Sequence, residues 1–152
     1  MATLAARIEQ FLDAHHVMSL ATAGESGAHA ASLMYARQGL ELYWTSEAQS
    51  HHSREIERDS RVTATIAPDY TDFRLIRGLQ AIGRAARLAD ARDVERGREL
   101  LVRRYAFLAE LASGPPALRK AFEQASFYRL LPERITFIDN TRGFGFKETL
   151  RC

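Results

Sequence analysis

Hydroxyl and imidazole side chains gather in one short segment of the chain. Thr45 and Ser46 end an aromatic stretch, and Ser50, His51 and His52 follow a few residues later. A helix that begins at Ser50 would present free backbone N–H groups and the positive end of its dipole, a combination that binds phosphate. The alternative is an ordinary N-cap beside two solvated histidines. Adjacent helical residues diverge, so the two imidazoles predict no metal site.

A second polar group lies inside an apolar segment, LIRGLQ, at residues 75–80. Arg77 and Gln80 would need polar partners if this segment were a buried strand. The phosphate or carbonyl groups of a ligand would supply them, with the guanidinium as the stronger donor. A position at the rim of a barrel would satisfy the same side chains with water.

The C-terminal segment 137–147, FIDNTRGFGFK, combines aromatic rings, two glycines and the cations Arg142 and Lys147. This composition suits a planar anionic ligand. It suits equally well a hairpin that closes a barrel.

The chain contains none of the strong catalytic signatures. There is no P-loop, dinucleotide-binding glycine pattern, serine-hydrolase elbow or HExxH zinc motif. The only cysteine is Cys152, which excludes a zinc site built from several thiolates. We therefore assign no catalytic residue from the sequence.

The elements that must position these groups are mostly strands. A helix ends near His15, and further helices are predicted after Ser50, over Ala91–Leu108 and from Pro116 to Ala125. Short apolar or alternating segments separated by turn residues predict strands at Val17–Thr22, His29–Arg37, Leu40–Thr45, Arg61–Ala67, Leu75–Leu88, Phe127–Leu131 leading through Pro132 into Arg134–Asp139, and Phe144–Leu150. Hairpins of this kind favour a mainly β, antiparallel barrel of six or seven strands with peripheral helices, as a single domain over residues 1–152.

Composition limits the possible partners. The 21 basic and 19 acidic residues leave a net charge of +2, which is no signature of nucleic-acid binding. The apolar runs are too short to span a bilayer, and acidic residues interrupt the N-terminal segment where a signal peptide would be apolar. With a single cysteine, we expect a protein of the reducing cytoplasm.

The segments FLDAHHVMSLAT, AHAASLMYA, LYWTSEAQSHHSREIERDSRVTATI, LIRGLQAIGRA and ITFIDNTRGFGFK occur in this order along nearly the whole chain. Together they resemble the pyridoxamine 5'-phosphate oxidase-like, FMN-binding split-barrel family, in particular a branch of small bacterial proteins without an assigned function. The last two segments carry the resemblance most specifically. It implies a split β-barrel and a homodimer that holds FMN in the clefts between subunits. The apolar side chains of Met34, Tyr35, Tyr43 and Trp44 suit the core or that interface.

The resemblance also implies which residues bind the cofactor. The strand matching residues 30–35, with Ala31, Ser32, Leu33 and Met34, would lie along the isoalloxazine through its backbone. Thr45, Ser50, His51 and His52 would hold the phosphate, with histidines in place of the family's Arg and Lys. Arg142 or Lys147 would replace an arginine near the flavin, and Ile138 stands near the place of the family's tryptophan. Arg77 and Gln80 complete the predicted site. The residues that bind the substrate phosphate in the true oxidase are not recognisable, so pyridoxamine phosphate is not the expected substrate.

Three functions follow from this resemblance. The first is an FMN-dependent oxidoreductase of a small molecule, with NADH or NADPH as a candidate reductant and no side-chain acid or base required. The second is a flavin-binding or flavin-carrying module without turnover. The third is a split barrel that binds haem or another cofactor, with His51 or His52 as a ligand.

Overall fold

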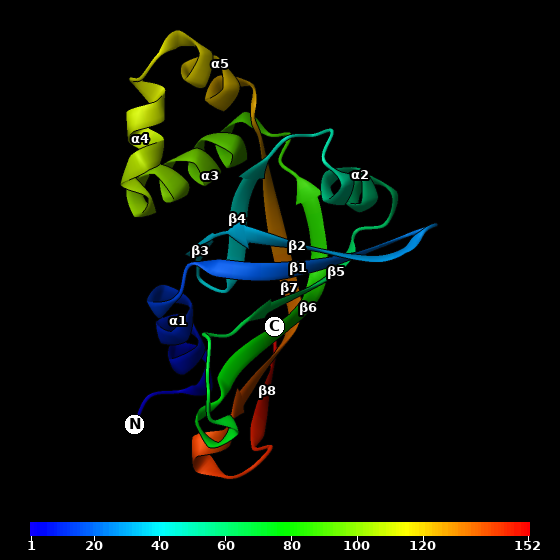
Figure 1. The fold of residues 1–152 in the computed structure, drawn as a ribbon, viewed down its shortest axis with the longest axis vertical. Helices are drawn as coiled ribbons and strands as arrows, with labels where there is room; N and C mark the ends of the chain where they lie inside the picture. The colour runs from blue at the N-terminus through cyan, green and yellow to red at the C-terminus, as the bar shows by residue number, and fades with distance from the viewer.

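The computed structural model describes residues 1–152 and is built around one antiparallel sheet of eight strands that curls into a half-barrel (Figure 1). The order of the strands is β2-β1-β5-β6-β7-β4-β3, and β8 pairs with β7 beside this path. The strands are β1 (Val17–Gly24), β2 (Gly27–Met34), β3 (Ala36–Gln38), β4 (Glu41–Ser46), β5 (Arg61–Ile66), β6 (Arg77–Arg87), β7 (Ser126–Asp139) and β8 (Lys147–Arg151). The predicted mainly β, antiparallel fold with peripheral helices is confirmed.

Five helices surround the sheet: α1 (Leu4–Ala14), α2 (His51–Arg58), α3 (Ala91–Arg104), α4 (Ala106–Ala112) and α5 (Pro116–Gln124). Helices α3 to α5 gather at one end of the molecule, while β8 and the turn before it lie at the other end (Figure 1). Two short 3-10 turns, η1 (Phe73–Leu75) and η2 (Asn140–Arg142), also lie at the β8 end. None of the helices combines the length and the apolar character that crossing a membrane requires.

The segment expected as one strand from His29 to Arg37 is divided at Tyr35. Its first part, β2, pairs with β1, and its second part, β3, pairs with β4. These are the two ends of the strand order, so Tyr35 is the point at which the curled sheet returns on itself. The Tyr35 ring is completely buried, and its hydroxyl donates a hydrogen bond to the carbonyl of Leu12 at 2.7 Å. Burial of the Tyr35 ring fixes the position at which β2 ends and β3 begins.

The strand expected to run from Phe127 through Pro132 to Asp139 is confirmed as one long strand, β7. Proline normally interrupts a ladder because it lacks an N–H group. Here Pro132 lies opposite Gly83, where the register between β6 and β7 shifts. A Cβ atom at Gly83 would lie 2.1 Å from the carbonyl oxygen of Leu131, so only glycine allows the two backbones to approach. Three predicted bounds were wrong: α3 ends at Arg104 rather than Leu108, the segment before Arg77 forms η1 rather than strand, and β8 begins at Lys147 rather than Phe144.

The core has two parts, and strand β4 contributes to both. Trp44 belongs to the cluster between the curled sheet and helices α1 and α2. Its neighbour Tyr43 points to the other side, into the cluster under α3, α4 and α5. Tyr35 and Trp44 are therefore internal to the subunit, whereas Met34 remains 42% exposed.

Candidate functional site

Helix α2 begins at the N-cap that the sequence predicts. The Ser50 hydroxyl oxygen accepts a hydrogen bond from the backbone N–H of Ser53 at 3.3 Å and donates to the Ser53 hydroxyl at 2.7 Å. Ser50 itself has extended backbone, and a short turn over residues 47–50 joins the end of strand β4 to the helix. This cap fixes the positions of the two histidines that follow it.

His52 points inward and is a structural residue rather than a surface cation. Its Nε2 lies 2.9 Å from the Ser46 hydroxyl and 3.3 Å from the Ser50 hydroxyl. Burial lowers the pKa of His52 below its usual value, and the neighbouring His29 and His51 lower it further. At neutral pH the imidazole is therefore uncharged, and Nε2 can accept a hydrogen bond from a serine.

His51 points outward, as expected for the residue next to a buried one on a helix. Its Nε2 lies 2.8 Å from Oε1 of Glu55, one helical turn further along α2. The same Oε1 accepts a hydrogen bond from the Thr22 hydroxyl of β1 at 3.0 Å. The ring of His29, from β2, packs against that of His51 with 4.3 Å between the ring centroids. Half of the His51 side chain is exposed, whereas Glu55 is buried.

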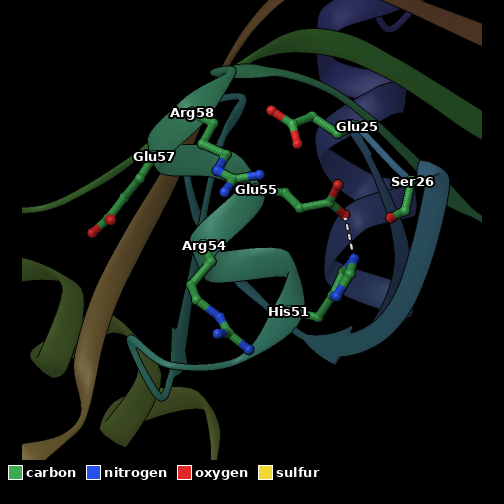
Figure 2. Close-up of a pocket in the computed structure, with 7 residues that line it drawn as sticks. All are labelled: Glu25, Ser26, His51, Arg54, Glu55, Glu57 and Arg58. Carbon is green, nitrogen blue, oxygen red and sulfur yellow. Dashed lines mark ion pairs between the residues drawn. The ribbon is translucent and has the colours of Figure 1, made fainter.

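An open hollow of about 470 Å³ lies between α2 and the turn of the β1–β2 hairpin (Figure 2). It is lined entirely by polar residues: Glu25, Ser26, His51, Arg54, Glu55, Glu57 and Arg58. Neither Arg54 nor Arg58 forms an ion pair. The two unpaired arginines and His51 offer hydrogen-bond donors to an anion, whereas Glu25, Glu55 and Glu57 line the same hollow and oppose one.

Thr45 does not belong to this cluster in the folded chain. Successive residues of a strand point to opposite faces, so Thr45 and Ser46 diverge. The Thr45 hydroxyl donates to the carbonyl of Ser126 at 2.9 Å, while Ser46 contacts His52. The structure thus brings Ser46, and not its predicted neighbour, to the histidines.

The other predicted site residues lie away from the histidines of α2. Arg77 Nε is 3.5 Å from Asp139 Oδ2, and its guanidinium lies over the rings of Phe11 and Phe137. Arg142 Nη1 is 2.8 Å from Glu148 Oε1. Lys147 is exposed on β8, and Gln80 is exposed on the outer face of the sheet.

The phosphate-binding and ring-binding candidates therefore lie at two separate places in one subunit. Thr45 pairs with Phe127 near the start of β7, and Lys147 pairs with Ile138, eleven residues further along the same strand. At about 3.3 Å per residue, this stretch of β7 is roughly 36 Å long. Residues Ala31 to Met34 lie on β2, at one end of the strand order. No single flavin mononucleotide can contact both groups of residues within one subunit.

The chain matches the family model described as pyridoxamine 5'-phosphate oxidase over residues 4–139, which is most of its length. The chain belongs to this family. A curated relative, a UPF0306 protein of Klebsiella pneumoniae, is 29% identical over 149 residues, which cover 97% of this chain and 92% of the relative.

Solved structures confirm the fold. A FAD-binding protein from Mesorhizobium loti is similar with a TM-score of 0.67 and 21% identity, over 90% of this chain and 94% of that one. A haem-binding protein from Mycobacterium smegmatis is similar with a TM-score of 0.76 and 18% identity, over 99% of this chain and 59% of that one. The fold of this family is thus shared by proteins that bind different cofactors.

Two residues of the cluster were not predicted from the sequence: His29 and Glu55. Glu55 could have been found, because a carboxylate four residues after a histidine on a helix lies on the same face. His29 could not, because only the pairing of β2 with β1 brings it beside α2.

Proposed function

We propose that the chain is an FMN-binding flavoprotein of the cytoplasm that works as a homodimer and catalyses a redox reaction of a small molecule. The separation of the predicted cofactor-binding residues into two distant groups carries this proposal. A symmetric dimer that places the α2 end of one subunit against the β8 end of the other would complete two identical sites. The FAD-binding structural neighbour and the membership of the family support a flavin as the ligand.

The outer face of the sheet has the character of a surface that a second subunit could cover. Its residues on β1 and β2 are small, with Ser19 opposite Ser32 and Ala21 opposite Ala30. Val17, Met34 and Ile82 add large apolar side chains that are 50%, 42% and 37% exposed. The outer edge of β2 also has no neighbouring strand, so its backbone groups are free to bind a partner or a ligand.

The available donors fit FMN in chemical type. His51 and Arg54, with the first N–H groups of α2, would hold the dianionic phosphate. The free backbone edge at Ala31–Met34 would face the polar edge of the isoalloxazine, and Arg142 or Lys147 of the second subunit would lie near the ring. FMN supplies the acceptor for a hydride or for electrons when bound. The chain's own residues bind and orient it.

Haem is the second candidate, because a structural neighbour binds it. His52 is unsuited to bind iron, because its Nε2 is buried between two serines. His51 is the histidine that could hold haem iron, because only its Nε2 is bound to Glu55 and its Nδ1 is free. Membership of the family favours the flavin.

Complementation between two inactive variants tests the shared site. One variant carries His51→Ala and Arg54→Ala, and the other carries Arg142→Ala and Lys147→Ala. We expect each variant alone to bind FMN weakly, as measured by equilibrium dialysis. After unfolding and refolding together, each mixed dimer has one intact site and one doubly altered site, so tight binding should return to about a quarter of all sites at random assortment.

Lys120→Ala provides a matched control, since Lys120 is the chain's other lysine and lies on α5. It should leave FMN binding unchanged. Failure of the mixture to bind more FMN than the separate variants would refute the shared site. Reduction of the bound FMN by NADH or NADPH would then distinguish an oxidoreductase from a flavin carrier.

A further inference from the structure

The carboxylate of Glu55 is buried in an unusual place for a charged group. It is 5% exposed, on the inner side of α2, and it is held from two directions by the Thr22 hydroxyl and by Nε2 of His51. A buried carboxylate is stable only when hydrogen bonds replace its water. These contacts therefore fix the position of the Glu55 carboxylate beside His51.

Gly24 makes room for this carboxylate. A Cβ atom at Gly24 would lie 1.7 Å from Oε2 of Glu55, so no other residue fits there without moving the side chain. Gly24 and Thr22 both belong to β1. The hairpin and the helix thus form a cradle with Glu55 inside it and His51 at its opening.

This arrangement determines which nitrogen of His51 carries the proton. Nε2 faces the carboxylate and acts as the donor, so in the neutral ring Nδ1 carries a lone pair. Figure 2 shows one ring nitrogen of His51 turned toward Glu55 and the other turned away from it. A lone pair repels a phosphate oxygen, whereas an imidazolium donates to Glu55 through Nε2 and to an anion through Nδ1 at the same time.

We propose that phosphate binding at this site is coupled to the uptake of a proton by His51, with Glu55 as the positioning residue. The inference rests on the proposed function, because it takes the phosphate to be that of FMN. Where the family's pattern has permanent cations, this chain would have a histidine that is a cation only when it is protonated. Its affinity for FMN would then fall as the pH rises through the range in which the imidazole of the complex loses its proton.

The other charged groups around His51 are compatible with this role. On α2 they are His52, which is neutral, Arg54 and Arg58, which attract an anion, and Glu57, which favours an imidazolium but opposes an anion. The hairpin contributes His29, packed against the ring of His51, and Glu25 at its turn. Glu55 is the only carboxylate within hydrogen-bonding distance of the His51 ring.

Calorimetric titration of the dimeric protein with FMN at pH 8, in two buffers of different ionisation enthalpy, measures the protons taken up. At this pH the FMN phosphate is already a dianion, since its second pKa is about 6, so uptake must come from the protein. We expect up to about one proton per FMN for the wild type and none for riboflavin, which lacks the phosphate. His51→Gln should abolish the uptake, and Glu55→Gln should reduce it and weaken FMN binding roughly tenfold at pH 8 and less at pH 6.

His16→Asn is the matched control, because His16 is exposed at the start of β1, away from α2. It should leave the uptake unchanged. If FMN binds but the heat shows no proton uptake, or if His51→Gln retains the uptake, the coupling is refuted while the proposed function stands. If FMN does not bind at all, the proposed function fails and the coupling fails with it.

Discussion

Replacement of Gly24 by alanine is the sharpest structural test of the Glu55 cradle. The backbone of Gly24 is not in the left-handed region, so alanine meets no conformational barrier there. The added Cβ would lie 1.7 Å from Oε2 and 2.8 Å from Cδ of Glu55, which forces the carboxylate to leave its position. It would then lose its hydrogen bonds to Thr22 and His51.

The expected cost follows from these two contacts. A hydrogen bond to a charged group contributes about 1.5–3 kcal/mol, and the half-exposed His51 belongs at or below the lower end of that range. Alanine also gains about 0.5 kcal/mol by restricting the unfolded chain. We therefore expect Gly24→Ala to lower the free energy of unfolding by about 2–3 kcal/mol, as measured by urea denaturation at pH 7.

A double-mutant cycle isolates the cause. In a Glu55→Ala background there is no carboxylate to displace, so Gly24→Ala should then cost almost nothing or stabilise slightly. If Gly24→Ala lowers the free energy of unfolding by the same amount in both backgrounds, the clash with Glu55 is not the cause. Gly24 then does not make room for the carboxylate.

Three further outcomes are expected. The lowered pKa of His52 means that the unfolded chain binds a proton there more readily, so the free energy of unfolding should fall as the pH drops below about 6.5. His52→Gln should make the urea midpoint less sensitive to pH between about 7.5 and 5.5. An unchanged dependence of the midpoint on pH would contradict the burial effect. Gly83→Ala should lower the free energy of unfolding by more than about 2 kcal/mol in urea titrations, because the added Cβ would clash with the backbone of Leu131. A loss below about 0.5 kcal/mol, which is typical of a surface substitution, would contradict the close approach of the strands. Tyr105→Phe should cost about 1–2 kcal/mol in the same assay, since the single proton of its hydroxyl is shared between the carbonyls of Tyr35 and His16. Full retention of stability would show that this hydrogen bond is dispensable.

The sequence predicted local structure well where local chemistry determines it. The Ser50 cap depends on a hydroxyl three residues before the N–H that it accepts from, and such a spacing is visible in the chain. The strands with alternating burial, such as β1 and β5, were predicted for the same reason. The resemblance to the family supplied the overall fold.

What the sequence could not give was the result of tertiary packing. The break at Tyr35 depends on a contact with α1, where the Tyr35 hydroxyl donates to the carbonyl of Leu12. The predicted site residues came from separate segments of the chain and from the resemblance to the family. Only the pairing along β7 shows that Thr45 and Lys147 lie at opposite ends of it.

The central claim is that this chain binds FMN in a site shared by two subunits. The most direct measurement is the absorption spectrum and mass of the small molecule that purifies with the protein, together with the molar mass of the protein by light scattering. We expect a flavin spectrum, the mass of FMN, a dimer, and one FMN for each subunit. A monomer in solution, or a Soret band from bound haem, would contradict the account.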